Sequence, residues 1–384
     1  MHYTARKAIQ LLACFFFVCS SLGEAMTSAA ENTKPGTTLV YIGTYTGTKS
    51  EGIYICRLDP ETGSLSEPEL AAKMTNPSWV TVHPNGKFLY AAGESGRGAV
   101  AGFSIESDGK LTPINTQPPG GGGPCHLAID QTGKTILVSN YGSGSVSSLK
   151  IADDGSLSSS AWQDQYPSLG EKQKPHAHHA AFDPSNQFAL VCDAGLDRIC
   201  VYRFDSATGT LTPNEPPFIA TSAETHPRHL VFSADGRFCY DIDEKAMSVT
   251  AFQFDAKLGV LKQIQSISTL PADFSGKAGS TAELILHPSG KFLYGSNRGP
   301  DNIVCYSVDA QTGKLTLIDH TDILGKTARS FGIDPSGQWM IVGHQNSNSM
   351  AQFKIDQTSG ELTPTGTKFD LGSPVCFKFL EMKP

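Results

Sequence analysis

Short β-prone segments follow one another along almost the whole chain, and no segment shows a convincing helical period of 3.6 residues. Segments such as WVTV (79–82), HLAI (126–129), HLVF (229–232) and ELIL (283–286) alternate in character. A polar turn and a second β-prone run follow each segment, as in HPNGKFLYAAGE (83–94). This pattern predicts an all-β fold of short antiparallel strands.

A turn motif of the form D-x-x-x-G-x-L recurs seven times at a spacing of about 50 residues. Its glycines are Gly63, Gly109, Gly155, Gly209, Gly259, Gly313 and Gly360. Four short strands per repeat of this length are typical of a propeller blade. We therefore predict a seven-bladed β-propeller with four-stranded antiparallel blades, with six or eight blades as the alternatives.

The two ends of the repeat region are complementary halves of one blade. LVYIGTYT (39–46) matches the second strand of a repeat, whereas SPVCFKFL (373–380) matches a first strand. Strands from both termini in one blade would close the ring and leave no long sheet edge exposed. We predict one propeller domain over residues 38–384, preceded by a flexible leader over 26–37.

The N-terminus has the pattern of a secretory signal peptide. Arg6 and Lys7 precede an apolar run over 8–22, and small residues follow it. The run is too short to span a bilayer comfortably. We predict a signal peptide over 1–25, a secreted or periplasmic protein and no membrane span. A lipoprotein site at Cys14 is the alternative.

Composition narrows the partners. The formal net charge is −7 and there are no Lys/Arg runs, which argues against a nucleic-acid partner. Seven cysteines remain after the predicted signal peptide, scattered and without a CxxC motif, which argues against a disulfide framework or a zinc cluster. The run His176-Ala177-His178-His179 suggests a metal site, but no Asp or Cys completes a set nearby. We predict no metal and no cofactor. The sequence does not determine the oligomeric state, and a monomer is the favoured one.

The strand order predicts which residues meet at one end of the central channel, which we call the mouth. The first strands start there, and their aligned inner column is Trp79, His126, His179, His229, Glu283, Ser330 and Cys376. The residues just before them are Ser78, Cys125, His178, Arg228, Ala282, Arg329 and Val375. The ends of the second strands add Thr44, Glu94, Tyr141, Ala194, Glu244, Arg298 and Gln345. Polar groups packed this closely cost stability unless they are paired, solvated or used.

Structural roles are alternatives for several of these residues. Arg228 and Glu244 could form an ion pair between neighbouring strands of one blade, and His126 and His229 could be hydrogen-bonded core histidines. Tyr141 could line the channel without contacting a ligand. Arginines that face a channel suit bidentate recognition of a carboxylate or phosphate.

Several motifs resemble the propeller-type 6-phosphogluconolactonase family, which also includes a fungal carboxy-muconate cyclase. The resemblance runs from about residue 38 to 380 and includes NPSWVTVHPNGKFLYA, VSNYGSGSV, KPHAHH, LDRICVYRFD and SNRGPDNI. It implies a catalytic set of His179 in PHAHH, Arg228 in HPRH, Glu244 in DIDE and Arg298 in SNRG. The chain departs from the family pattern at Asp243-Glu244-Lys245, Ala328 and His344.

The resemblance implies hydrolysis of a sugar lactone, 6-phosphogluconolactone or a related aldonolactone, to the open acid. His179 would act as base, Arg228 and Arg298 as electrophilic and anion-binding groups, and Glu244 as orienting partner or proton donor. The predicted substrate-binding residues are His126, Tyr141, Glu94, Glu283 and Arg329. A carboxy-muconate-type lactonising cyclase and a non-catalytic propeller that binds a protein or glycan are the alternatives.

Overall fold

The structure is a computed structural model that describes residues 36–47, 49–170, 173–277 and 279–382. Within these residues, 28 strands form seven four-stranded antiparallel sheets. The predicted signal peptide and nearly all of the predicted leader lie outside the described residues. The described part of the chain contains no helix long and apolar enough to cross a membrane.

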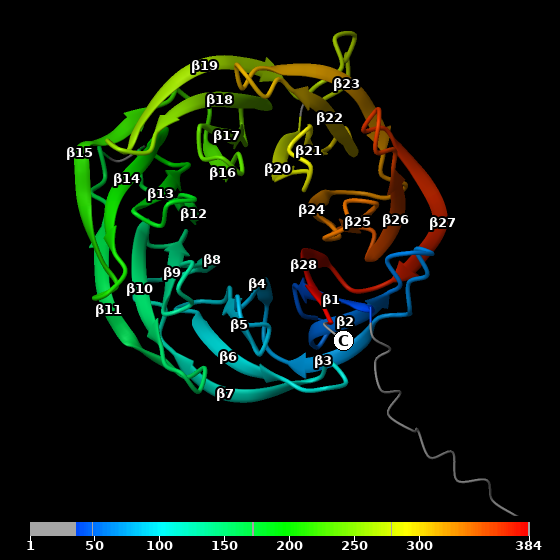
Figure 1. Ribbon diagram of the computed structural model, residues 1–384, viewed down its shortest axis with the longest axis horizontal. Helices are drawn as coiled ribbons and strands as arrows, with labels where there is room; N and C mark the ends of the chain where they lie inside the picture. The colour runs from blue at the N-terminus through cyan, green and yellow to red at the C-terminus, as the bar shows by residue number, and fades with distance from the viewer. Residues whose placement is uncertain (1–35, 48, 171–172, 278, 383–384) are drawn as a thin grey trace, which may run out of the picture. The chain divides into compact units, whose positions relative to one another are not determined.

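Figure 1 shows the seven sheets following one another around a ring. The innermost strands are β4 (Pro77–Val82), β8 (Pro124–Ile129), β12 (Ala177–Phe182), β16 (Pro227–Phe232), β20 (Ser280–Leu286), β24 (Ala328–Ile333) and β28 (Pro374–Glu381). The second strands are β5 (Phe88–Gly93), β9 (Thr135–Asn140), β13 (Phe188–Asp193), β17 (Phe238–Asp243), β21 (Phe292–Arg298), β25 (Trp339–His344) and β1 (Thr38–Thr44).

The two outer positions of each sheet complete the blades. The third strands are β6 (Ala99–Ile105), β10 (Ser145–Ile151), β14 (Arg198–Asp205), β18 (Ser248–Asp255), β22 (Asn302–Val308), β26 (Ser349–Ile355) and β2 (Gly52–Leu58). The outermost strands are β7 (Leu111–Gln117), β11 (Leu157–Gln165), β15 (Thr210–Ala220), β19 (Val260–Ser268), β23 (Leu315–Asp322), β27 (Leu362–Asp370) and β3 (Glu69–Lys73). We number the blades from the one that contains β1, so that blade 2 begins with β4.

Blade 1 is built from both ends of the chain, as predicted. Its strand order is β28-β1-β2-β3, and Ile42 of β1 pairs with Phe377 of β28. The seven-bladed prediction is confirmed, and so is ring closure by the terminal strands. Closure means that the innermost strand of every blade lies beside the innermost strands of two neighbours.

The repeated glycine turns link neighbouring blades as well as ending hairpins. All seven motif glycines have positive φ, for example 85° at Gly109 and 81° at Gly155, which other residues adopt at a cost. Six turn carbonyls accept a hydrogen bond of 2.7–3.0 Å from a side chain of the preceding blade. The pairs are Tyr41–Gly109, Tyr90–Gly155, Ser148–Gly209, Asn214–Gly259, Tyr294–Gly360 and Gln352–Gly63.

The seam between blades 5 and 6 differs from the other six. The Tyr240 hydroxyl is buried and has no hydrogen-bond partner among the described residues, although Tyr240 lies in the same column as Tyr90. Gln265 bonds to both backbone groups of Leu315 at this seam, as Asn115 does to those of Leu157 between blades 2 and 3.

Two conservative variants should separate these two seams. Tyr90→Phe removes the buried hydrogen bond from the tyrosine hydroxyl to the Gly155 carbonyl. We therefore expect the free energy of unfolding to fall by about 1 kcal/mol. Tyr240→Phe removes a hydroxyl with no partner and should leave stability unchanged or raised. Urea unfolding of both variants measures the difference, and an equal loss in the two would contradict this account of the seams.

Candidate active site

A β-bulge at the start of the innermost strand determines which side chains reach the mouth. In blades 2, 3, 4, 5 and 7 the strand register shifts between the first and third residues, so one extra residue stands at that point. In blade 5 the extra residue is Arg228, between Pro227 and His229. The bulge lets two consecutive residues approach the same space, as Ser78 and Trp79 do in blade 2. Strict alternation would direct such neighbours to opposite faces.

A small cavity lies at the mouth, between the starts of the innermost strands. Its lining residues come from both predicted first-strand columns and from the loop after β5: Ser78, Trp79, Glu94, Cys125, His178, Arg228, His229, Glu283, Arg329 and Val375. Four of the predicted site residues line it, namely Glu94, Arg228, Glu283 and Arg329. The strand columns read from the sequence therefore predicted correctly that these four charged side chains lie around one cavity.

Glu244 joins two arginines at the edge of this cavity. Arg298 Nη2 lies 2.5 Å from Glu244 Oε1, and Arg228 Nε lies 3.6 Å from Glu244 Oε2. Arg298 also donates to the Thr281 carbonyl, at 2.6 Å from Nη2. Burial acts to raise the pKa of Glu244, but Arg228 and Arg298 outweigh it and hold that pKa below its usual value. Glu244 is therefore an ionised bridge, which suits an orienting partner better than a proton donor.

Arg329 lines the cavity without a carboxylate partner among the described residues. It forms no ion pair within 4 Å with any described residue, and its guanidinium carbon lies 5.4 Å from the ring centre of Tyr45. Tyr45 donates to Glu94 Oε2 at 2.7 Å, so this carboxylate already has a hydrogen-bond donor. An arginine in this position can bind the carboxylate, phosphate or hydroxyl oxygens of a ligand.

A belt of aromatic rings forms the inner wall of the mouth. The ring centres of Trp79 and His126 are 4.2 Å apart, those of His126 and His179 3.8 Å, and those of His179 and His229 4.8 Å. Burial lowers the pKa of His179 to about 3 and those of His126 and His229 well below the ordinary value. These three histidines are neutral at pH 7.

The two adjacent histidines of β12 occupy different places. His178 lines the cavity, and its buried Nδ1 has no hydrogen-bond partner among the described residues. His179 belongs to the belt, is 9% exposed and is not among the cavity-lining residues. Its Nδ1 is also buried without a partner.

The remaining predicted residues lie around the cavity rather than in its wall. Tyr141 is 38% exposed and stacks on His176, with ring centres 4.4 Å apart and planes at 18°. His126 accepts the Ala180 amide at Nδ1 and takes part in the belt. Arg298 pairs with Glu244, and Glu244 pairs in turn with Arg228 of the cavity wall. Among the described residues, no group of three or more His, Cys, Asp or Glu is arranged to hold a metal ion.

Sequence reasoning missed two residues. Tyr45 comes directly after β1, and its hydrogen bond to Glu94 joins blades 1 and 2 at the mouth. Lys378 of β28 places its ammonium 4.1 Å from the ring centre of Trp79 and adds positive charge beside the histidine belt. Tyr45 follows Thr44 of the second-strand column by one residue. Lys378 follows Cys376 of the inner column by two residues, and strand alternation places these two side chains on the same face of β28.

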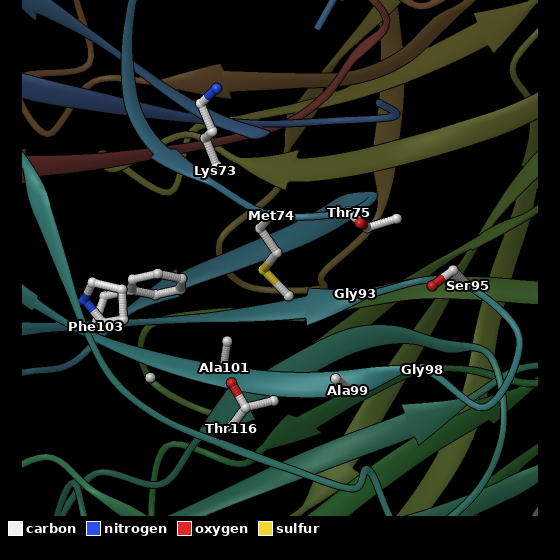
Figure 2. Close-up of a pocket in the computed structure, with 12 residues that line it drawn as sticks. Lys73, Met74, Thr75, Gly93, Ser95, Gly98, Ala99, Ala101, Phe103 and Thr116 are labelled. Carbon is white, nitrogen blue, oxygen red and sulfur yellow. The ribbon is translucent and has the colours of Figure 1, made fainter. Parts of the chain in front are cut away.

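A second depression lies on the flank between blades 1 and 2 (Figure 2). Met74, Ala99, Ala101 and Phe103 contribute to its mainly apolar lining. Lys73 is the one ionisable side chain among its twelve lining residues, and its ammonium pairs with Glu51 at 2.5 Å. This depression lacks the converging acid, base and cationic groups of the mouth, which is therefore the candidate active site.

Comparisons with known proteins find relatives over nearly the whole propeller. The family profile described as "Lactonase, 7-bladed beta-propeller" matches residues 39–379. The 6-phosphogluconolactonase of Bacillus subtilis (strain 168) is 33% identical over 345 residues, covering 88% of this chain and 97% of that protein. The 6-phosphogluconolactonase of Formosa agariphila is 31% identical over 341 residues, covering 84% and 94%. The solved periplasmic gluconolactonase of Pseudomonas aeruginosa is 31% identical, with a TM-score of 0.85, covering 91% and 100%.

Proposed function

This chain belongs to the lactonase family of seven-bladed β-propellers, and from that premise we propose that it hydrolyses a sugar lactone to the open acid. The observation that carries the proposal is that Arg228 and Arg329 line one small cavity and that Glu244 connects Arg228 to a third arginine, Arg298. The substrate class is a gluconolactone, with or without a phosphate, as in the names of the relatives.

Lactone opening requires three groups. Water must lose a proton as it adds to the carbonyl carbon, the carbonyl oxygen must hold negative charge, and the ring oxygen must gain a proton as its bond to that carbon breaks. Arg228 lines the cavity and can stabilise the oxyanion. Arg298 keeps Glu244 oriented at 2.5 Å, and Arg329 can hold the polar end of the substrate.

The base in this proposal is His179, the residue that the motif comparison implies. Its neutral ring can accept the proton from water and return it to the ring oxygen as the bond from that oxygen to the carbonyl carbon breaks. An anionic ligand nearby would raise its low pKa toward the working range. His178 is a second candidate for a specific reason, because its ring lines the cavity while that of His179 does not. Glu94, His126 and Tyr141 would form the surrounding substrate-binding groups.

A pH-stat assay of the purified protein against glucono-δ-lactone, 6-phosphogluconolactone and other aldonolactones tests the activity. Arg329→Ala should raise KM by about 10- to 100-fold for the phosphorylated lactone and less for the neutral one, because a charge-assisted contact is lost. Arg237→Ala is the matched control, since this arginine pairs with Asp235 at a turn far from the cavity. If the parent protein hydrolyses no lactone of the panel, the proposed function is wrong.

We also propose that the protein is exported to a secreted or periplasmic location. The support is the pattern of residues 1–25 together with the similarity to a gluconolactonase described as periplasmic. Mass spectrometry of the mature protein tests the proposal, and a chain that retains Arg6 and Lys7 would contradict it.

A further inference from the structure

A hydrogen-bonded chain of three buried side chains runs along the cavity wall from Glu283 through His229 to Arg228. His229 Nδ1 lies 2.7 Å from Glu283 Oε1, and His229 Nε2 lies 3.1 Å from Arg228 Nη1. A guanidinium can only donate hydrogen bonds, so Nε2 must be the acceptor and Nδ1 must carry the hydrogen. The two partners thereby determine one neutral tautomer of His229.

The Glu283 carboxylate accepts hydrogen bonds from its own blade and from a neighbouring blade. Leu284 donates its amide to Glu283 Oε1 at 3.1 Å, and Ser330 of blade 7 donates to Oε2 at 3.1 Å. Ser296 Oγ accepts the Glu283 amide at 2.9 Å. With 5% of its surface exposed, the carboxylate cannot turn away from His229 without losing these contacts.

The other end of the chain orients the guanidinium of Arg228, which is 2% exposed. Nη1 donates to the Ala282 carbonyl as well as to His229, so both of its N–H groups are used. Nε makes no hydrogen bond and lies 3.6 Å from Glu244 Oε2. Nη2 makes no hydrogen bond to a described residue, which leaves it as the donor available to a ligand in the cavity.

This arrangement requires a neutral His229. Burial and then Arg228 hold the pKa of His229 well below its usual value, and His179, Lys378 and Arg329 act in the same direction. A protonated ring would direct an N–H at Arg228 Nη1 and break the chain. Because the Nε2 lone pair is already used by Arg228, His229 is poorly placed to take a proton from water.

We propose that His229 and Glu283 are positioning residues that hold Arg228 with its Nη2 toward the lactone carbonyl. The inference rests on the proposed function, in which Arg228 stabilises the oxyanion. It assigns to Glu283 the task of fixing the histidine tautomer, and to His229 the task of anchoring Nη1.

Two variants of His229 separate positioning from proton transfer. Gln places an amide oxygen near the site of Nε2 and can still accept from Arg228, whereas Asn places its amide near the site of Nδ1 and keeps only the contact with Glu283. With glucono-δ-lactone as substrate, we expect His229→Gln to retain most of the parental kcat/KM. His229→Asn should lose about 10- to 100-fold, mainly in kcat, because a hydrogen bond to a charged group is lost.

An equal loss in the two variants would show that His229 transfers a proton or packs structurally, and would overturn the proposal. Full activity in both would overturn it as well. A measurement that does not depend on turnover is the ¹⁵N spectrum of histidine-labelled protein, where we expect the Nδ1–H form of His229 in the parent and in Arg228→Lys. An Nε2–H form in the parent would overturn the proposed hydrogen-bonded chain even if lactone hydrolysis is confirmed. An Nδ1–H form would support that chain even if the panel shows no hydrolysis.

Discussion

Replacement of His179 by glutamine is expected to lower kcat for lactone hydrolysis by about 10²–10⁴-fold, the usual cost of losing a general base. Glutamine keeps much of the ring's volume, so the contacts at 3.8 Å with His126 and 4.8 Å with His229 are replaced rather than deleted. KM should change little, because His179 does not line the cavity. Initial rates by pH-stat on whichever lactone the parent hydrolyses measure the effect.

His178→Gln is the matched comparison, because the two residues are adjacent on β12 and similarly buried. If His178→Gln loses turnover and His179→Gln keeps it, the base is His178 and the assignment from the motif is wrong. A thermal melt of both variants checks that neither has lost its fold. Parental turnover in both variants would exclude β12 as the source of the base.

The fold could be predicted because each blade repeats the same local physics. A turn that needs positive φ favours glycine at one position. The motif glycine recurs seven times between Gly63 and Gly360, and each copy marks one hairpin turn. Ring closure followed from the two incomplete ends of the repeat. Neither inference depends on long side chains or on contacts between blades, which explains why both were confirmed.

The site was harder to predict because its geometry depends on features without a strong sequence pattern. The bulge at Arg228 brings consecutive residues of one strand to the same cavity, which alternation alone does not predict. Partner choice is a second such feature. Glu244 was weighed as a partner of Arg228 within blade 5, but its shorter contact is with Arg298 of blade 6, since long side chains select among several neighbours.

His229 illustrates the same limit. Its column placed it at the mouth, but the sequence could not separate a core histidine from a functional one. The distinction came from its two partners, Glu283 at 2.7 Å and Arg228 at 3.1 Å, which lie on different sides of the ring. One partner is the residue before it, and the other belongs to the next blade.

Acidification below pH 6.5 is expected to destabilise this protein steeply. Burial holds the pKa of His179 at about 3 and that of His344 at about 4, and it holds those of His126, His178 and His229 well below the usual value. The folded protein keeps these five rings neutral, whereas the unfolded chain protonates them near pH 6.5. Their contribution to stability is therefore fully present above pH 6.5 and is lost as the pH falls.

The expected loss is large. At pH 5.5 a histidine that stays neutral in the folded protein lowers the free energy of unfolding by about 1.4 kcal/mol, so His179 and His344 together cost on the order of 3 kcal/mol. His126, His178 and His229 act in the same direction. Asp241 and Asp243 act in the opposite direction, because burial raises the pKa of both carboxyls. Urea unfolding at several pH values between 5 and 8 measures the slope.

His344→Asn provides the sharpest control for this prediction. His344 ends its second strand opposite Ser349, and Asn140 and Asn297 hold the corresponding positions of blades 3 and 6, opposite Ser145 and Asn302. Asparagine therefore suits the site, and it cannot take up a proton there. Between pH 7 and 5.5, the free energy of unfolding should fall by about 1 kcal/mol less in the variant than in the parent. A parental slope in His344→Asn, or a parent equally stable at pH 5.5 and 7, would show that these histidines do not govern acid unfolding.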